Sequence, residues 1–237
     1  MAQKISREKI RYGLKHDEFI ETAFDITTWV EEHWQKVAYV AGAIVVVGLG
    51  VMAFIAWQGN RKAEAARLFG EGMLAYQDTR QGSALDALGL PTDRSAKYGE
   101  AIAKFEAARE RAGGSALGDV ARLYQGIVYL ESGDAAQAVT VFEAVAAGDD
   151  PVLAGTARAN LAEAYVSSGQ TQQAIDLWRQ IADDSEEFFP ADIALLNAGR
   201  LLAQQGRTEE SRQVLLELIE RFPSAPSAIA ARELLEN

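Results

Sequence analysis

The sequence predicts an all-α protein in which a single transmembrane helix is followed by a helical solenoid of about four helix pairs and a capping helix. Three observations lead to this prediction. An uncharged apolar run covers residues 37–57, and the part that follows it repeats with a period of 36 residues. The composition is rich in Ala, Leu, Glu, Gln and Arg and includes only five prolines, which favours helix.

The apolar run reads VAYVAGAIVVVGLGVMAFIAW and contains no charged residue over residues 37–57. As a helix it would be about 31 Å long, which matches a bilayer core of roughly 30 Å. Trp34 and Tyr39 lie near one end and Trp57 at the other, where amphipathic rings favour the membrane–water interface. A signal peptide would be shorter and would carry a cleavage site, and a soluble core helix is rarely apolar all round. We therefore expect one transmembrane helix at 37–57.

The segment before this helix, residues 1–36, combines a basic tail with an amphipathic pattern. Residues 1–15 carry five Lys/Arg against one acidic residue. Residues 16–36 place apolar side chains at helical spacing with acidic residues between them, which predicts a helix at the interface or against a protein partner. His16, Asp17 and Glu18 are consecutive and would point different ways on a helix, so we expect no metal site there.

The part after the apolar run, residues 58–237, contains internal repeats. Residues 123–145 align with residues 159–181 at a shift of 36, and residues 197–223 form a third copy at a shift of 37. A first copy is split between residues 67–77 and 98–110. The aligned positions are Tyr129 and Tyr165; Gly133, Gly169 and Gly206; Ala101, Ala138, Ala174 and Ser211; and Phe105, Phe142, Trp178 and Leu215.

Each aligned position has a physical role in a helix pair. The glycines would end the first helix of each pair in a left-handed turn. The small residues would let the two helices approach closely, and the aromatic residues would fill the groove against the tyrosines. Pro151, Pro190 and Pro223 would separate successive pairs. This pattern resembles the tetratricopeptide repeat family over residues 64–237, and the resemblance implies a superhelix that binds other proteins.

Two further segments of this domain carry predictions. Residues 224–237 should form a capping helix with Ser227 as its N-cap. The insertion at 78–97 is rich in Gly, Ser, Pro and Asp, so it should be a surface loop. We favour a tolerated insertion without a function of its own over a binding element. The acidic residues between helix pairs, such as Asp150, are expected to be solvated linkers and N-caps rather than a calcium site.

Charge and composition exclude several classes of function. Residues 59–237 hold 17 Lys/Arg and 27 Asp/Glu, a net charge of −10, and such a surface repels nucleic acid. There is no Cys, which rules out disulfides, thiol catalysis and thiolate metal sites. The two histidines, His16 and His33, precede the apolar run, so the repeat region cannot assemble a Ser/His/Asp triad. We expect no enzymatic activity, no cofactor and no metal.

The stretch at residues 27–77 contains aromatic residues before the span, a polar exit with Gln58, and a basic pair that leads into an Ala-rich helix. It resembles the YfgM-like ancillary SecYEG translocon subunit family. That resemblance implies a bacterial inner-membrane protein with a cytoplasmic N-terminus and a periplasmic repeat domain. The Lys/Arg count on the two sides of the span leaves the orientation open.

Candidate partner-binding residues follow from the family's inner-face positions on the first helix of each pair. They are Phe69, Met73, Tyr76, Leu123, Ile127, Leu130, Ala159, Glu163, Val166, Leu196 and Arg200. Packing between pairs is an equally open role for several of them. Phe69 and Met73 stand where repeats that bind acidic C-terminal tails place Lys and Asn, so we do not expect that ligand.

Two functions remain open from the sequence. The first is a membrane-anchored interaction module, ancillary or chaperone-like, that holds translocon subunits or exported chains. The alternative is a scaffold for envelope assembly, cell division or motility machinery, with self-association. Ala38 and Gly42 form a small-xxx-small step that could seat a second helix in the membrane.

Overall fold

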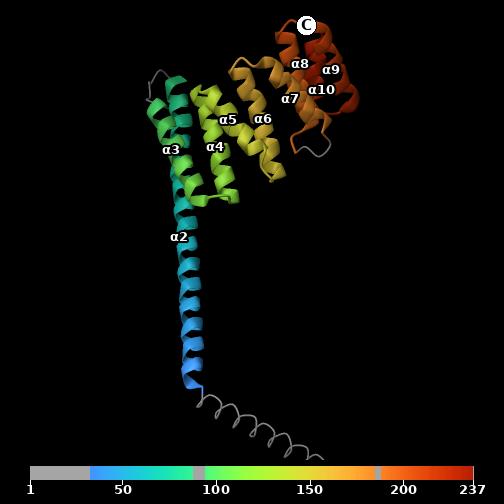
Figure 1. The fold of residues 1–237 in the computed structure, drawn as a ribbon. Helices are drawn as coiled ribbons and strands as arrows, with labels where there is room; N and C mark the ends of the chain where they lie inside the picture. The colour runs from blue at the N-terminus through green and yellow to red at the C-terminus, as the bar shows by residue number, and fades with distance from the viewer. Residues whose placement is uncertain (1–32, 88–93, 185–187, 237) are drawn as a thin grey trace, which may run out of the picture. The chain divides into compact units, whose positions relative to one another are not determined.

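The computed structural model describes residues 33–87, 94–184 and 188–236. Helices account for most of these residues (Figure 1). Their bounds are α2 (Trp34–Ala87), α3 (Arg94–Ala112), α4 (Ala116–Ser132), α5 (Ala135–Ala146), α6 (Pro151–Ser167), α7 (Thr171–Asp183), α8 (Ala191–Gln204), α9 (Thr208–Arg221) and α10 (Pro226–Glu236). The chain divides into two compact units, Met1–Gly59 and Asn60–Asn237. The basic tail and most of the predicted amphipathic helix at 16–36 lie outside the described residues.

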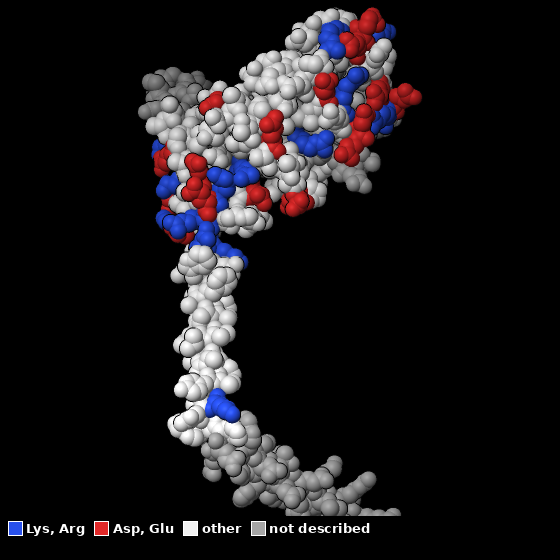
Figure 2. All heavy atoms as spheres, in the orientation of Figure 1, with Lys and Arg blue, Asp and Glu red and all other residues white. Residues whose placement is uncertain are grey.

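The described part of the first unit is the N-terminal portion of α2. Its large apolar side chains are exposed, as at Ile44 and Met52. An 18-residue window of this helix has a mean hydropathy of 2.4, and none of that window is buried. The helix carries no charged residue between Lys36 and Arg61, which is the white stretch of α2 in Figure 2. By length and composition, α2 can cross a membrane.

The second unit is a stack of helix pairs. The portion of α2 from Asn60 onward packs on α3, and α4/α5, α6/α7 and α8/α9 form the next three pairs, with α10 at the end (Figure 1). The first helices α4 and α6 also touch, and the capping helix α10 contacts both α8 and α9. The predicted all-α solenoid is confirmed.

The first helices of three pairs end in the predicted left-handed turns. Gly133, Gly169 and Gly206 have φ angles of 91°, 79° and 73°. Each turn is closed by the same two backbone bonds: the glycine N–H donates to the carbonyl three residues back, and the next N–H donates to the carbonyl five residues before it. This is the Schellman arrangement, and it requires a residue that tolerates positive φ.

The predicted seam within each pair is also confirmed. Ala101, Ala138 and Ala174 are fully buried, and Ser211 is nearly so, with its hydroxyl donating to the Gly199 carbonyl at 2.8 Å. The large partners Phe105, Phe142, Trp178 and Leu215 are all at most 2% exposed. The buried side chains form three clusters along the stack, and partly buried Ile127, Tyr165 and Leu177 each pack against two of them.

A second set of small residues, which the sequence analysis missed, lies opposite the large ones. A Cβ at Gly126 would come within 2.6 Å of the Phe142 ring, and a Cβ at Gly199 within 2.6 Å of Leu215. Gly72 faces Phe105 in the same way. These glycines are in helices and serve close approach rather than a turn. The sequence did contain a signal for this second set of small residues. Ala162 lies 36 residues after Gly126, and Gly199 lies a further 37 residues on.

Two local predictions are wrong. The insertion at 78–97 is not a loop over most of its length, because α2 continues to Ala87 and α3 begins at Arg94. Alanine and leucine at 84, 85 and 87 sustain the helix beyond Gly82 and Ser83. Ser227 is not an N-cap, because α10 begins at Pro226, a residue well suited to the first helical position. The buried Ser227 hydroxyl instead donates to Asp192 at 2.6 Å.

Candidate protein-interaction surface

The eleven predicted partner-binding residues come from α2, α4, α6 and α8, the first helix of each pair. Four are buried: Tyr76, Leu123, Ala159 and Leu196. Five are half-buried: Phe69, Met73, Ile127, Leu130 and Val166. Glu163 and Arg200 are exposed. The two exposed residues and the half-buried five are the members that a partner can touch without unpacking the core.

One equivalent position runs through all four pairs and changes character along the stack. It is occupied by Met73, Ile127, Glu163 and Arg200, the last three at shifts of 36 and 37 residues. We call these four residues the inner strip. Its first half is apolar and packs partly against a core cluster with Tyr76 and Phe105. Its second half presents an acid and a base to solvent.

The apolar half of this surface is held by an aromatic cluster. The ring of Tyr124 lies 5.7 Å from Phe69, 6.4 Å from Tyr76 and 5.7 Å from Phe105. Offset and edge contacts at such distances stabilise beyond simple burial. Tyr124 was not predicted, although it was detectable as an aromatic residue where the next two copies have Asn160 and Asn197.

Tyr76 is a link between the first two pairs rather than a free contact. Its hydroxyl donates to Glu131 Oε1 at 2.6 Å, from α2 to the last turn of α4. Burial raises the pKa of this hydroxyl, and the neighbouring Glu131 carboxylate raises it further. The tyrosine therefore stays protonated and donating across the physiological range.

The polar half has its own electrostatic feature at Glu163. Partial burial of the carboxyl raises its pKa, even though the residue as a whole is exposed. An ionised carboxylate there is incompletely solvated. A nearby cationic group would compensate for that lost solvation.

Two exposed isoleucines extend the inner strip and were missed. Ile193 precedes Leu196 by three residues and Arg200 by seven, which places it on the same face of α8. It is 40% exposed, and Ile229, 36 residues later on α10, is 59% exposed. Their regular spacing was a signal in the sequence, but only the central positions of each helix had been considered.

Three hollows lie away from the inner strip. One, of about 490 Å³, is lined by Ser95, Tyr98, Gly99 and Ile102 of α3 with Glu131 and Ser132 of α4. Another, of about 230 Å³, is lined by Leu161 and Tyr165 of α6 with Gln173, Asp176, Leu177 and Gln180 of α7. None of the eleven predicted residues lines either one. Within the described ranges, no group of three or more His, Cys, Asp or Glu residues could hold a metal ion.

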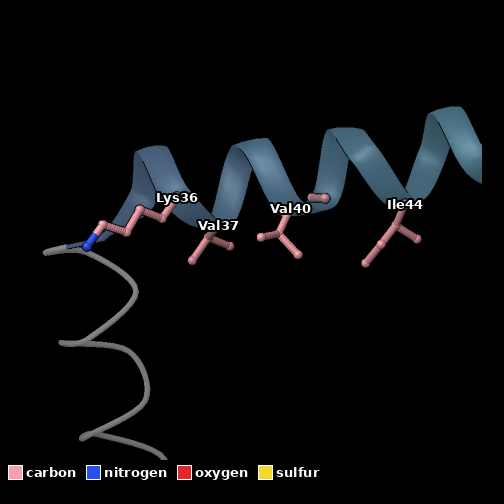
Figure 3. Close-up of a pocket in the computed structure, with 5 residues that line it drawn as sticks. Lys36, Val37, Val40 and Ile44 are labelled. Carbon is pink, nitrogen blue, oxygen red and sulfur yellow. The ribbon is translucent and has the colours of Figure 1, made fainter.

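The third hollow lies on α2 in the first unit (Figure 3). Val37, Val40 and Ile44 point to the same side of the helix, while the Lys36 side chain extends toward its N-terminal end (Figure 3). That extension keeps the ammonium group clear of the apolar face. A lipid chain or another apolar helix suits this face.

Comparison with known proteins identifies the repeats. The tetratricopeptide repeat family model matches residues 93–152 and 159–226, together more than half of the chain. The chain belongs to the tetratricopeptide repeat family. No curated protein matches it. It is thus a repeat scaffold of the kind that binds other proteins, and the predicted resemblance to this family is confirmed.

Solved tetratricopeptide repeat structures share the fold. The chain is similar to the crystal structure of the TPR-like repeats of a protein from Podosopora anserina described as a putative kinesin light chain, with a TM-score of 0.54 and 18% identity. A substituted form of that protein gives a TM-score of 0.55 at the same identity. In both cases the match covers 72% of this chain and 84% of the other.

Proposed function

We propose that this protein is a membrane-anchored interaction module of the YfgM-like type, ancillary to the protein translocon. In this proposal α2 spans a bacterial inner membrane, with the N-terminus in the cytoplasm and the repeat domain in the periplasm. The inner strip then holds translocon subunits or emerging chains in a chaperone-like manner. The module needs no cofactor and catalyses no reaction.

The proposal rests on one observation: the same chain contains an apolar helix long enough to span a membrane and a set of protein-binding repeats. A helix with a mean hydropathy of 2.4 over 18 residues precedes repeats that belong to a protein-binding family. In water such an exposed apolar helix would be unstable, whereas in a bilayer its side chains are solvated. The likeness of residues 27–77 to the translocon subunits supports the choice of partner.

The inner strip supports binding of extended chains. Half-buried Met73 and Ile127 offer apolar contacts, and exposed Ile193 offers another on α8, seven residues before Arg200. The partly desolvated Glu163 carboxyl favours a basic residue on the bound chain. A segment with an apolar stretch followed by a basic residue fits this order.

Site-specific photo-crosslinking in native membranes tests the proposal. A photoreactive amino acid is placed at Ile193 or at Glu163, and at Leu216 of α9 as a control that is 48% exposed but belongs to a second helix of its pair. We expect adducts with translocon subunits or exported chains from the first two sites and few from the third. Equal labelling from all three, or none from the inner sites, would contradict the proposal.

The alternative scaffold function has one specific observation in its favour. Ala38 and Gly42 are exposed on α2, and a Cβ at Gly42 would meet nothing within 4 Å. A second copy of α2 could therefore approach closely at this step. Adducts between copies of this chain, or with division or secretion machinery alone, would favour the scaffold over the translocon role.

A further inference from the structure

The end of the repeat domain where α2 enters it differs in charge from the rest of the domain. Residues 58–71 and 104–115 contain six Lys/Arg and four Asp/Glu, a net charge of +2. The remainder of residues 59–237 contains 11 Lys/Arg and 23 Asp/Glu, a net charge of −12. Figure 2 shows blue side chains at this end of the domain, interleaved with red ones. We call it the basic end.

The basic end is built by contacts between α2 and α3. Arg61 Nη2 donates to the Glu110 carbonyl at 3.2 Å, and Arg111 forms an ion pair with Glu64 at 3.4 Å. Arg109 and Arg111 lie in the last turn of α3, where cations complement the helix dipole. The fold thus brings cations from two separate stretches of sequence to one place.

Lys62 is the member of this end most open to a ligand. It is exposed, and among the described residues no carboxylate lies within ion-pair distance of it. Other basic side chains here, such as Lys104, are engaged with carboxylates. Arg61 precedes Lys62 directly, and its guanidinium donates to the Glu110 carbonyl on α3 at 3.2 Å. Lys62 is therefore the residue here most accessible to an anion, and Arg61 adds positive charge on a neighbouring face of α2.

Their depth along α2 fits the phosphate layer of a membrane. Trp57 ends the apolar run, and Arg61 and Lys62 follow it by four and five residues on the same helix. At about 1.5 Å per residue they lie about 6–8 Å further along the helix. The headgroup region on each side of a bilayer is about 5–7 Å thick. Long basic side chains reach such a layer readily.

We infer that Lys62, with Arg61 adding positive charge beside it, binds the phosphate of an anionic phospholipid headgroup, and that the basic end tolerates an anionic membrane surface better than the acidic remainder of the domain does. This inference rests on the proposed anchoring by α2. Charge complementarity selects the lipid class, since the −12 remainder of the domain is repelled by the same surface.

Lipid counting on the full chain tests the inference. The protein is purified in a neutral detergent and titrated with phosphatidylglycerol or phosphatidylcholine, and bound lipids are counted by native mass spectrometry. Each cation near an anionic surface contributes about fivefold to binding. The wild type should therefore prefer phosphatidylglycerol, and Arg61→Gln/Lys62→Gln should lower that preference by about 25-fold, to near parity.

A matched control exists at the other end of the domain. Arg212 is exposed, and Arg232 Nη2 donates to the Pro223 carbonyl at 3.3 Å, much as Arg61 donates to Glu110. Arg212→Gln/Arg232→Gln removes the same charge and should leave the lipid preference unchanged. Lys62→Gln alone should lower the preference about fivefold with an unchanged melting temperature, which separates lipid binding from any effect on α2–α3 packing.

The outcomes are distinguishable. An unchanged preference in Arg61→Gln/Lys62→Gln, or an equal loss in the control, would overturn the inference. Competition by inorganic phosphate at equal concentration would show a general phosphate site and refute the lipid assignment. A wild-type chain that fails to enter lipid nanodiscs would refute the anchoring itself, whereas an inserted chain without lipid preference would refute only this inference.

Discussion

At the scale of single residues, Trp178 is the largest of the fully buried side chains among the described residues. It is 2% exposed, packs with Ala174 and Tyr165, and its ring centroid lies 5.4 Å from that of Phe189. Trp178→Ala would leave a large cavity, so we expect a loss of about 3–5 kcal/mol in the free energy of unfolding. Chemical denaturation of the full chain in detergent, followed by circular dichroism, measures this.

Leu216→Ala is the control for that prediction, because Leu216 is 48% exposed. It should change the free energy of unfolding by less than about 1 kcal/mol. A loss below about 1 kcal/mol in Trp178→Ala would mean that the ring is not a central part of the core.

Two carboxyl groups should respond to pH with opposite signs. The hydrogen bond from Lys104, at 2.5 Å, lowers the pKa of Glu71 below 4.5. Its contribution to stability is therefore complete above pH 4.5 and is lost as the pH falls below that value. Burial raises the pKa of Glu163 above 4.5, so ionising this carboxyl costs stability, and that cost disappears on acidification.

Melting temperatures recorded from neutral to acidic pH test both signs. Glu71→Gln should weaken the acid-induced fall in melting temperature that the wild type shows below pH 4.5. Glu163→Gln should raise the melting temperature at neutral pH and leave it unchanged at low pH. Parallel curves for the two variants would contradict the assignment of these groups.

At the scale of helices, close approach within a pair depends on glycine. Gly126→Ala and Gly199→Ala each place a Cβ 2.6 Å from a buried side chain, of Phe142 and Leu215 respectively. We expect each to cost about 1–3 kcal/mol by overpacking. Equilibrium unfolding of the two variants gives the number.

Gly70→Ala in α2 is the counterpart, because a Cβ there meets nothing within 4 Å. In an exposed helix position this change should stabilise by about 0.5–1 kcal/mol. Stabilisation by Ala at all three glycines would show that helix propensity, rather than packing, dominates these sites.

The helix ends show what a sequence can and cannot reveal. Gly133, Gly169 and Gly206 were predictable because positive φ restricts the residue. Asp150 is an N-cap, as expected, and Pro151, which was expected only to separate two pairs, is the first residue of α6. The prediction for the 78–97 insertion was wrong over most of its length because Gly, Ser and Asp disfavour a helix without forbidding it, and tertiary packing can outweigh that preference. Thr79 illustrates this, since it is fully buried within α2.

The candidate site was less predictable than the fold. Periodicity located the inner-face positions, but it could not tell which of them the next pair would cover. Leu196 is 7% exposed and Ile193 is 40% exposed, although they are one turn apart. Burial depends on which helix packs on which face, and a single sequence does not contain that information.

At the scale of the whole molecule, partner capture by the inner strip can be tested directly. Met73 and Ile127 are half-buried, so Met73→Asp/Ile127→Asp should weaken capture of a bound chain by about 1–3 kcal/mol, provided that circular dichroism shows an intact fold. Unfolding of this variant would show that both residues serve packing.

Glu163→Lys/Arg200→Glu provides a second variant that does not enter the core, because both residues are exposed. It should change which segments are captured, with basic segments disfavoured, while the melting temperature stays close to that of the wild type. Unchanged capture by both variants would move the binding site away from the inner strip.

In the proposed function, α2 anchors the chain in a membrane and displays the repeats on its outer side. The most direct test is a phosphatase reporter, active only outside the cytoplasm, fused after Asn237 of the full chain. We expect an active reporter in a fusion that resists extraction from membranes at alkaline pH. A stable fusion with a silent reporter would reverse the orientation and contradict the translocon role, and a fusion that alkaline treatment extracts would contradict the anchor.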